Sequence, residues 1–323
     1  MDGIKHTALA SLRIAVLSGG QSAERKISLQ SGAAVADALE RKGHSVARID
    51  PATQPLETVD WSTLDVAFLA LHGTYGEDGG AQEVLERHGV VFTSSSAATS
   101  RLAFSKSAAK ERFIQCGVPT PSYTLIHETD GLERIHEHAR RIGYPIVIKP
   151  DAQGSSIGIS IVRQPEELEA ALSRCFYFES FGLIERMIEG TEWTLGVIDN
   201  DPLPLIRIET ARSFFDYQAK YEDDATQYLF DDSVAAATLL RLRDAGAAAC
   251  RALGTSGIAR ADIRLNADGE PFILEVNTIP GMTDHSLVPK AAGKIGLDMG
   301  QLCEVVIERA LAAAGPRSVR RAS

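Results

Sequence analysis

The sequence predicts an α/β protein in which a parallel sheet comes first and further packed units follow. Strand patterns alternate with helix patterns in the first third, which is typical of a parallel sheet with crossover helices. At 323 residues with 44% hydrophobic content, the chain has enough apolar material for two or three packed units and too much for one. Small residues after Ser94-Ser95-Ser96 indicate a connector over 95–105, so a domain boundary is expected there.

The first third predicts a ligand crevice at one edge of its sheet. The elements expected, in order, are a strand at 13–18, a helix at about 28–41, and strands at about 45–49 and 66–71. Gly19-Gly20 follows the first strand, and a glycine-rich stretch at 72–80 follows the last. Because parallel strands end at the same edge of a sheet, both loops are expected to face a ligand there.

The rest of the chain continues with mixed strands and helices. The middle part predicts a helix at 106–116, strands at 145–149, 158–162 and 183–188, and a helix at 165–174. The last third predicts strands at about 192–198, 203–208, 261–265 and 272–276, an alanine-rich helix at about 233–253 and a final helix at about 299–314.

Composition excludes several classes of function. The net charge of −10 is spread along the chain and argues against a nucleic-acid partner. No run approaches the roughly 20 apolar residues of a membrane span, and Asp2, Lys5 and His6 interrupt the start, so a cytoplasmic protein with no membrane partner is expected. The four cysteines lie far apart without a C-x-x-C pair, which predicts buried or incidental thiols in place of zinc ligands or disulfides.

A glycine- and serine-rich loop at 151–158 is a candidate phosphate site. It follows Lys149 directly and lies between two predicted strands, so it is neither a P-loop nor a dinucleotide fingerprint. Its small residues would let backbone N–H groups approach phosphate oxygens, and Lys149 would add a cation. A glycine-rich hairpin without a ligand is an equally good interpretation of this stretch alone.

Three oxygen-bearing side chains near the C-terminus indicate a metal site. On a strand, Glu275 and Asn277 share one face, and Asp262 on a neighbouring strand is able to join them. Such an incomplete set of hard oxygen ligands suits Mg²⁺, with phosphates and water completing the octahedron. The alternative is a solvated acidic strand face, but the apolar residues around Glu275 argue against it.

Two loops carry further candidates. The Pro280-Gly281 turn beside the metal ligands would aim a backbone N–H at developing negative charge, with Arg260 reaching the same place, unless it is an ordinary turn. Glu24 follows the first strand and would pair with a substrate ammonium. For Glu24 alone, a contact with Arg25 or with backbone donors is the better alternative.

Six stretches in register resemble the D-alanine–D-alanine ligases, and the similarity extends from about residue 13 to about residue 311. The matching stretches are GGQSAERKISLQSG at 19–32, HGTYGEDGG at 72–80, KPDAQGSSIGIS at 149–160, FFDYQAKY at 214–221, ARADIRL at 259–265 and LEVNTIPGMTDHSL at 274–287. Each is moderately specific, but the ordered set is very specific.

The resemblance implies an ATP-grasp enzyme that ligates two molecules of D-alanine with ATP. It implies an N-terminal Rossmann-like substrate-binding domain at 1–98 and two α+β ATP-grasp domains at 99–188 and 189–323. A mobile lid at about 211–231 is expected to close over the reactive acyl phosphate. Two Mg²⁺ ions, with Mn²⁺ as a possible substitute, and a homodimer are also implied.

The resemblance assigns roles residue by residue. The residues that match the ATP site are Lys106, Lys149, Ser155, Glu185, Glu192 and Lys220, with Glu185 facing the adenine amino group and Glu192 the ribose. The residues that match the D-alanine sites are Glu24, His72, Lys220, Ser286 and Leu287. Arg260 and the Gly281 backbone match the oxyanion site, Asp262, Glu275 and Asn277 match the magnesium ligands, and Glu24, Ser155 and Tyr221 match a hydrogen-bonded triad. For His72, a buried histidine with satisfied nitrogens is the alternative.

Other functions share parts of this pattern. A D-alanine–D-lactate ligase, or another ATP-grasp carboxylate–amine ligase, would share every phosphate and metal residue, and Tyr221 favours the dipeptide-forming relatives. A nucleotide-binding regulatory protein without turnover is the alternative outside the enzymes. The intact set of Glu24, Ser155, Tyr221 and Arg260 argues against that alternative.

Overall fold

The computed structural model describes residue 4 and residues 6–210, 226–230 and 234–315. The N-terminal part forms a three-stranded parallel sheet in the order β2-β1-β3, as the alternating pattern predicts. Its elements are β1 (Arg13–Leu17), α1 (Arg25–Arg41), β2 (Ser45–Ile49), β3 (Val66–Leu69) and α2 (Gly80–Arg87). Strands β1 and β3 are buried along nearly their whole length, whereas β2 buries Ile49.

The segment expected to be a connector is helical. Helix α3 (Ala97–Phe104) begins after Ser96, whose side chain accepts a hydrogen bond from the N–H of Thr99. Ser105 ends α3 and caps α4 (Lys106–Gln115) in the same way. Small residues are compatible with both a loop and a close-packed helix, so composition did not distinguish them.

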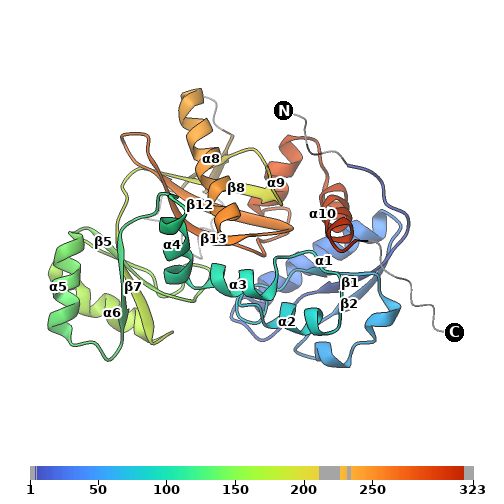
Figure 1. Ribbon diagram of the computed structural model, residues 1–323, viewed down its shortest axis with the longest axis horizontal. Coiled ribbons are helices and arrows are strands. Elements are labelled where there is room, and N and C mark those ends of the chain that lie inside the picture. The colour runs from blue at the N-terminus through green and yellow to red at the C-terminus, as the bar shows by residue number, and fades with distance from the viewer. Residues whose placement is uncertain (1–3, 5, 211–225, 231–233, 316–323) are drawn as a thin grey trace.

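The central part is a four-stranded antiparallel sheet in the order β4-β7-β5-β6. Its elements are β4 (Tyr123–His127), α5 (Leu132–Ile142), β5 (Ile146–Pro150), β6 (Ser160–Val162), α6 (Leu168–Phe176) and β7 (Phe181–Arg186). Helices α5 and α6 bury their apolar sides against this sheet in one core. Figure 1 shows this part at one end of the molecule and the N-terminal sheet at the other.

The last part is built on a second antiparallel sheet, in the order β11-β10-β8-β12-β13 with β9 beside β8. Its strands are β8 (Thr191–Ile198), β9 (Asp201–Pro202), β10 (Ile206–Glu209), β11 (Gln227–Leu229), β12 (Ile258–Leu265) and β13 (Pro271–Asn277). Helix α8 (Ala236–Leu253) covers the sheet with small and aliphatic residues, and α4 joins the same core. Strands β12 and β13 therefore lie between α8 and the cavities described below.

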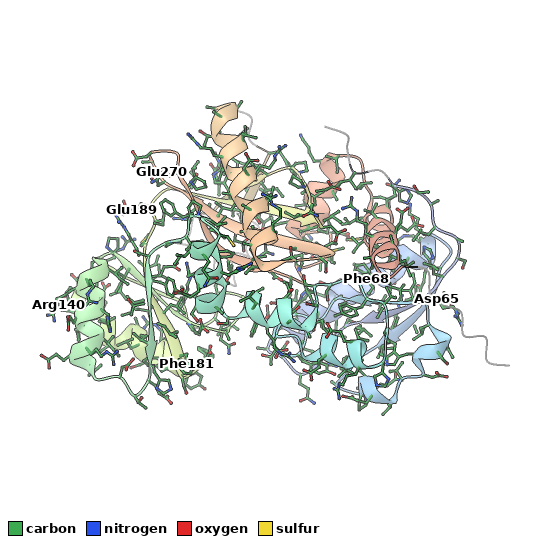
Figure 2. All side chains as sticks on the ribbon, viewed as in Figure 1. Asp65, Phe68, Arg140, Phe181, Glu189 and Glu270 are labelled. Carbon is green, nitrogen blue, oxygen red and sulfur yellow. The ribbon has the colours of Figure 1, made fainter. Side chains whose placement is uncertain are left out.

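The C-terminal helices return to the N-terminal sheet. After α9 (Leu287–Lys294), helix α10 (Met299–Ala313) packs against α1, and its Val305 and Val306 share a core with Ile14 and Phe68. Figure 2 shows Phe68 close to α10, whereas Glu189 and Glu270 lie at the outer edge of the molecule. This packing holds the loop before α9 against the crevice edge of the N-terminal sheet.

All four cysteines are free thiols, and three of them are buried, which agrees with the prediction of buried or incidental thiols. Within the described ranges, none of the helices has the length and apolar character needed to cross a membrane.

Candidate active site

Two cavities meet where the three parts of the chain converge. The first has about 630 Å³ of empty space, and the second has about 790 Å³. Residues of the first cavity include Glu24, His72, Ser155, Arg260, Asn277 and Gly281. Residues of the second include Lys149, Ser156, Glu185, Glu192, Asp262 and Arg264. Lys106 and Glu275 border both cavities, so a ligand in one would be able to react with a ligand in the other at this point.

Glu24 reaches the first cavity from the loop before α1. It is buried, and its carboxylate accepts a hydrogen bond from the Ser155 hydroxyl of the β5–β6 loop. Glycines surround this contact: a Cβ on Gly73 would lie 2.6 Å from Glu24 Oε2, and a Cβ on Gly154 would lie 2.7 Å from it. The glycines at these two positions thus make room for the carboxylate. Two of the three members of the expected triad are brought together.

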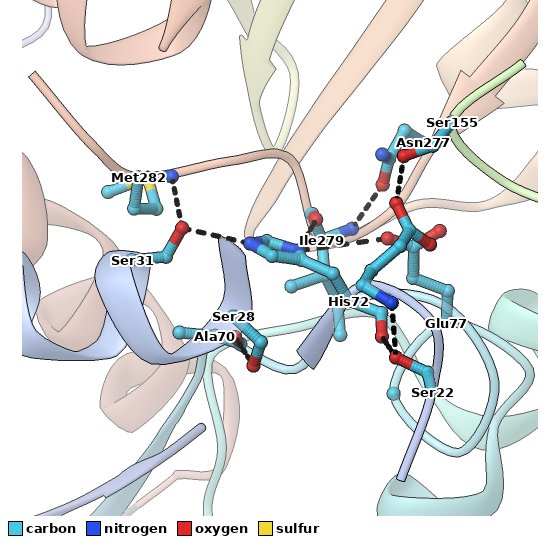
Figure 3. A network of polar contacts seen from close by, with 12 residues as sticks. Ser22, Ser28, Ser31, Ala70, His72, Glu77, Ser155, Asn277, Ile279 and Met282 are labelled. Atoms are coloured by element: carbon cyan, nitrogen blue, oxygen red, sulfur yellow. Dashed lines mark hydrogen bonds and ion pairs between the residues drawn. The ribbon is translucent and has the colours of Figure 1, made fainter. Parts of the chain in front are cut away.

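His72 holds the N-terminal part against the loop that follows β13 (Figure 3). Its Nδ1 lies 3.0 Å from the Ile279 carbonyl and must donate, because a carbonyl only accepts. The Ser31 hydroxyl, 2.9 Å from Nε2, therefore donates to the ring and accepts from the Met282 N–H at 3.1 Å. Both ring nitrogens form hydrogen bonds within the protein, which agrees with the alternative interpretation of His72 as a buried histidine with satisfied nitrogens. His72 also borders the first cavity.

The loop before α9 carries the other expected substrate residues. Gly281 borders the first cavity, and a Cβ at this position would lie 2.8 Å from the Ser286 hydroxyl. That hydroxyl accepts a hydrogen bond from the Thr283 N–H at 3.0 Å, which stabilises the turn between Thr283 and Ser286. Ser286 precedes α9, and Leu287 is its buried first residue.

The expected metal ligands lie on one face of neighbouring strands. Asp262 on β12 is directly opposite Glu275 on β13, and Asn277 is two residues further on the same strand. Both Asp262 oxygens accept hydrogen bonds from Arg260, at 2.8 and 2.7 Å, so this structure pairs the expected oxyanion residue with an expected ligand. The hard oxygen donors of this set fit a magnesium ion. The part of the chain described contains no group of three His, Cys, Asp or Glu side chains that could hold a metal ion. The third donor of the expected set, Asn277, is an amide.

Lysines and carboxylates line the second cavity. Lys149 Nζ donates to Glu185 Oε1 at 3.0 Å, and Lys106 Nζ donates to the Gln153 carbonyl at 2.6 Å and lies 3.6 Å from Glu275. Glu192 on β8 accepts from Arg264 on β12 at 3.3 Å. The cavity thus has ammonium groups, which suit phosphates, and carboxylates, which accept hydrogen bonds from a ligand.

The β5–β6 loop joins antiparallel strands, as expected. Ser155 and Ser156 adopt positive φ angles of 50° and 59°, a backbone conformation that is uncommon for residues with a side chain. Asp151, which sequence reasoning missed, begins the loop and accepts from the Ser107 N–H at 2.7 Å and the Ser105 hydroxyl at 2.7 Å. Asp151 therefore fixes the start of α4, and with it Lys106, relative to the loop.

Two expected residues, Lys220 and Tyr221, lie outside the described residues, as does most of the expected lid at 211–231.

A further residue near the second cavity was not predicted from the sequence. Lys110 on α4 is fully buried and contacts Glu185. It lies four residues after Lys106, on the same face of α4.

Comparisons with known proteins agree on one family. The model of the D-ala D-ala ligase C-terminus matches residues 113–308. A D-alanine–D-alanine ligase from Nitrosomonas europaea is 40% identical over 296 residues, which cover 92% of this chain and 96% of the relative. The solved D-alanine–D-alanine ligase from Bacillus anthracis has a TM-score of 0.85 at 34% identity, covering 94% of this chain and 99% of that one. A structure of the Bacillus anthracis ligase complexed with ATP has a TM-score of 0.83 at 31% identity, with the same coverage.

Proposed function

Because the chain belongs to the D-alanine–D-alanine ligase family, we propose that it joins two molecules of D-alanine with ATP to give D-alanyl-D-alanine, ADP and phosphate. The product is a precursor for peptidoglycan, the bacterial cell wall. The observation that carries this proposal is the meeting of a substrate-sized cavity and a phosphate-suited cavity at Lys106 and Glu275. A ligase that activates a carboxylate needs such a junction, because the carboxylate must reach the γ-phosphate.

The reaction has two covalent steps. A carboxylate oxygen of the first D-alanine attacks the γ-phosphorus of ATP, the bond to the β–γ bridging oxygen breaks, and ADP leaves. The amine of the second D-alanine then attacks the acyl carbon, the bond from that carbon to the phosphate oxygen breaks, and the released phosphate carries away the proton that the nitrogen loses. Lys106 and Lys149 would offset negative charge on the phosphates, and the Glu24 carboxylate would hold the ammonium of the first D-alanine.

The remaining assignments follow the same two cavities. Arg260 and the Gly281 N–H would stabilise the tetrahedral oxyanion, which requires Arg260 to exchange its contact with Asp262 for the reacting group. Ser286 and Leu287 would anchor the carboxylate of the second D-alanine. Glu185 would accept from the adenine amino group and Glu192 from the ribose. His72 would support the first substrate through its bonds to Ser31 and Ile279.

We propose Asp262, Glu275 and Asn277 as the residues that hold Mg²⁺, with two ions bound and Mn²⁺ as a substitute. The bound metal would screen the charges of the phosphate oxygens. The support is the cross-strand placement of Asp262 opposite Glu275, together with the oxygen-only donor set. A cytoplasmic location and a homodimer are further proposals that rest on the family resemblance.

The deciding experiment is phosphate release with ATP, Mg²⁺ and D-alanine, with the product identified by mass. D-alanine-dependent phosphate release with formation of the dipeptide is the expected result. A product made only with D-lactate as the second substrate would replace the proposal with a D-alanine–D-lactate ligase. ATP binding without D-alanine-dependent turnover would instead support a regulatory nucleotide-binding protein.

A further inference from the structure

Lys110 is a buried lysine beside the second cavity, although it borders neither of the two cavities. Its side chain is fully buried, with 0% exposed. Lysine is almost never fully buried unless it is paired, because removing an ammonium from water costs several kcal/mol. Lys110 follows Lys106 by one turn of α4, and only Lys106 reaches the cavities.

The contacts of Lys110 fix its ammonium behind Glu185. Nζ lies 2.5 Å from Glu185 Oε2 and donates to the Thr120 hydroxyl at 2.7 Å. Thr120 in turn donates to the Ile273 carbonyl of β13 at 2.8 Å. Tyr123 places its ring 5.6 Å from Nζ. The ammonium of this α4 lysine therefore contacts β7 through Glu185, the segment before β4 through Thr120, and β4 through the ring of Tyr123.

Glu185 is shared between two lysines on opposite sides. Lys149 contacts both of its oxygens, at 3.0 and 2.9 Å, and borders the cavity, whereas Lys110 approaches from the protein interior. Lys110, Lys149 and Glu185 are 0%, 5% and 2% exposed, so two positive charges and one negative charge are buried together. The excess positive charge lies on the cavity side, where an anionic ligand would neutralise it.

The pKa values of Glu185 and Lys110 depend on burial and on the charges that these residues place beside one another. Burial alone disfavours the charged form of Glu185, but the charges of Lys110 and Lys149 outweigh burial and lower the pKa of Glu185 below its usual value. Burial is also the main influence on Lys110 and lowers its pKa to about 8, against the opposing charges of Glu185 and the more distant Glu275. Glu185 Oε2 lies within reach of both ammonium groups, whereas Oε1 is contacted by Lys149 on the side of the cavity.

We propose that Lys110 is a positioning residue for the nucleotide base: it keeps Glu185 ionised and oriented toward the cavity when Lys149 turns from Glu185 to a phosphate. The ionised carboxylate accepts from the amino group of adenine and repels the carbonyl that guanine has at the same position. Lys110 thereby supports the preference for ATP over GTP. This inference rests on the proposed function only for the assignment of the second cavity to ATP.

The test compares equilibrium binding of ATP and GTP, without D-alanine, among the wild type, Lys110→Met, Glu185→Gln and the double variant. We expect Lys110→Met to weaken ATP binding by about tenfold and GTP binding by less than about twofold, since one buried charge-assisted contact is affected. Lys110→Arg should restore much of the preference because it keeps the charge. Lys294→Met is the control: it removes an exposed lysine at the C-terminal end of α9, whose Nζ lies 5.2 Å from the Phe230 ring, and it should change neither affinity.

The double-mutant comparison separates positioning from general support of the fold. In the Glu185→Gln background, Lys110→Met should change the ATP-to-GTP ratio by less than about twofold, because no carboxylate remains to be held. Lys110→Met removes the excess positive charge and leaves Lys149 paired with Glu185, so this variant should fold, and circular dichroism checks the fold of every variant. An equal effect of Lys110→Met in both backgrounds, or equal weakening of ATP and GTP, would overturn the proposal. D-alanine-dependent phosphate release by the wild type tests the proposed function separately.

Discussion

The substitution Gly154→Ala tests the contact between Glu24 and the β5–β6 loop. A Cβ at Gly154 would lie 2.7 Å from Glu24 Oε2, and ordinary contacts begin at 3.4 Å, so either the loop or the carboxylate must move by about 0.7 Å. Gly73 also lies against Glu24 Oε2, since a Cβ there would be 2.6 Å from this oxygen. A shift of this size would break the hydrogen bond between Ser155 and Glu24.

The expected loss of kcat/KM follows from the strength of the hydrogen bond between Ser155 and Glu24. A hydrogen bond to a charged group contributes about 1.5–3 kcal/mol, which corresponds to about a 10- to 150-fold decrease in kcat/KM for D-alanine. The KM for ATP should change by less than about threefold, because Gly154 borders only the first cavity.

The assay is the initial rate of phosphate release over a range of D-alanine concentrations with saturating ATP. Gly131→Ala is the matched control, since a Cβ there has no neighbour within 4 Å in the same central part of the chain. A Gly154→Ala enzyme within about twofold of the Gly131→Ala enzyme in kcat/KM for D-alanine would refute the reasoning.

Three further predictions concern the metal, acid stability and packing. Glu275→Gln should abolish ligation and leave the circular dichroism spectrum unchanged; normal ligation would remove the metal assignment. Hydrogen bonding from Arg25 lowers the pKa of Asp50 from 3.8 to about 2, so this group stabilises the fold above about pH 4 and loses that effect as the pH falls through 2. Asp50→Asn should therefore cost about 1–2 kcal/mol in urea unfolding at pH 7 and progressively less toward pH 2, and a pH-independent cost would contradict this. Gly257→Ala should lower the Tm at least about 4 °C more than Gly254→Ala, because both have similar positive φ angles but only the former would place a Cβ against a backbone oxygen, 2.1 Å from Thr93. Equal Tm values for these two variants would contradict the packing argument.

Several features of the site were predictable from short stretches of sequence. The alternation of strands and helices predicted the parallel sheet. The spacing of Glu275 and Asn277 predicted one strand face, with Asp262 on a neighbouring strand. These inferences succeed because the periodicity of a strand, and the edge at which its loop emerges, depend on neighbouring residues. The ordered set of six motifs predicted the family for the same reason, since each motif is a local arrangement.

Sequence by itself therefore determined the order of strands, loops and reactive residue types, while tertiary structure decided which charged groups meet. Lys110 has the same local pattern as an exposed helical lysine, yet the packing of α4 against β7 and β13 buries it against Glu185. Likewise, only the fold shows that Arg260 pairs with Asp262 and that α10 closes the N-terminal sheet. The physical reason is that burial and electrostatic pairing depend on segments distant in the chain, whose approach no local periodicity records.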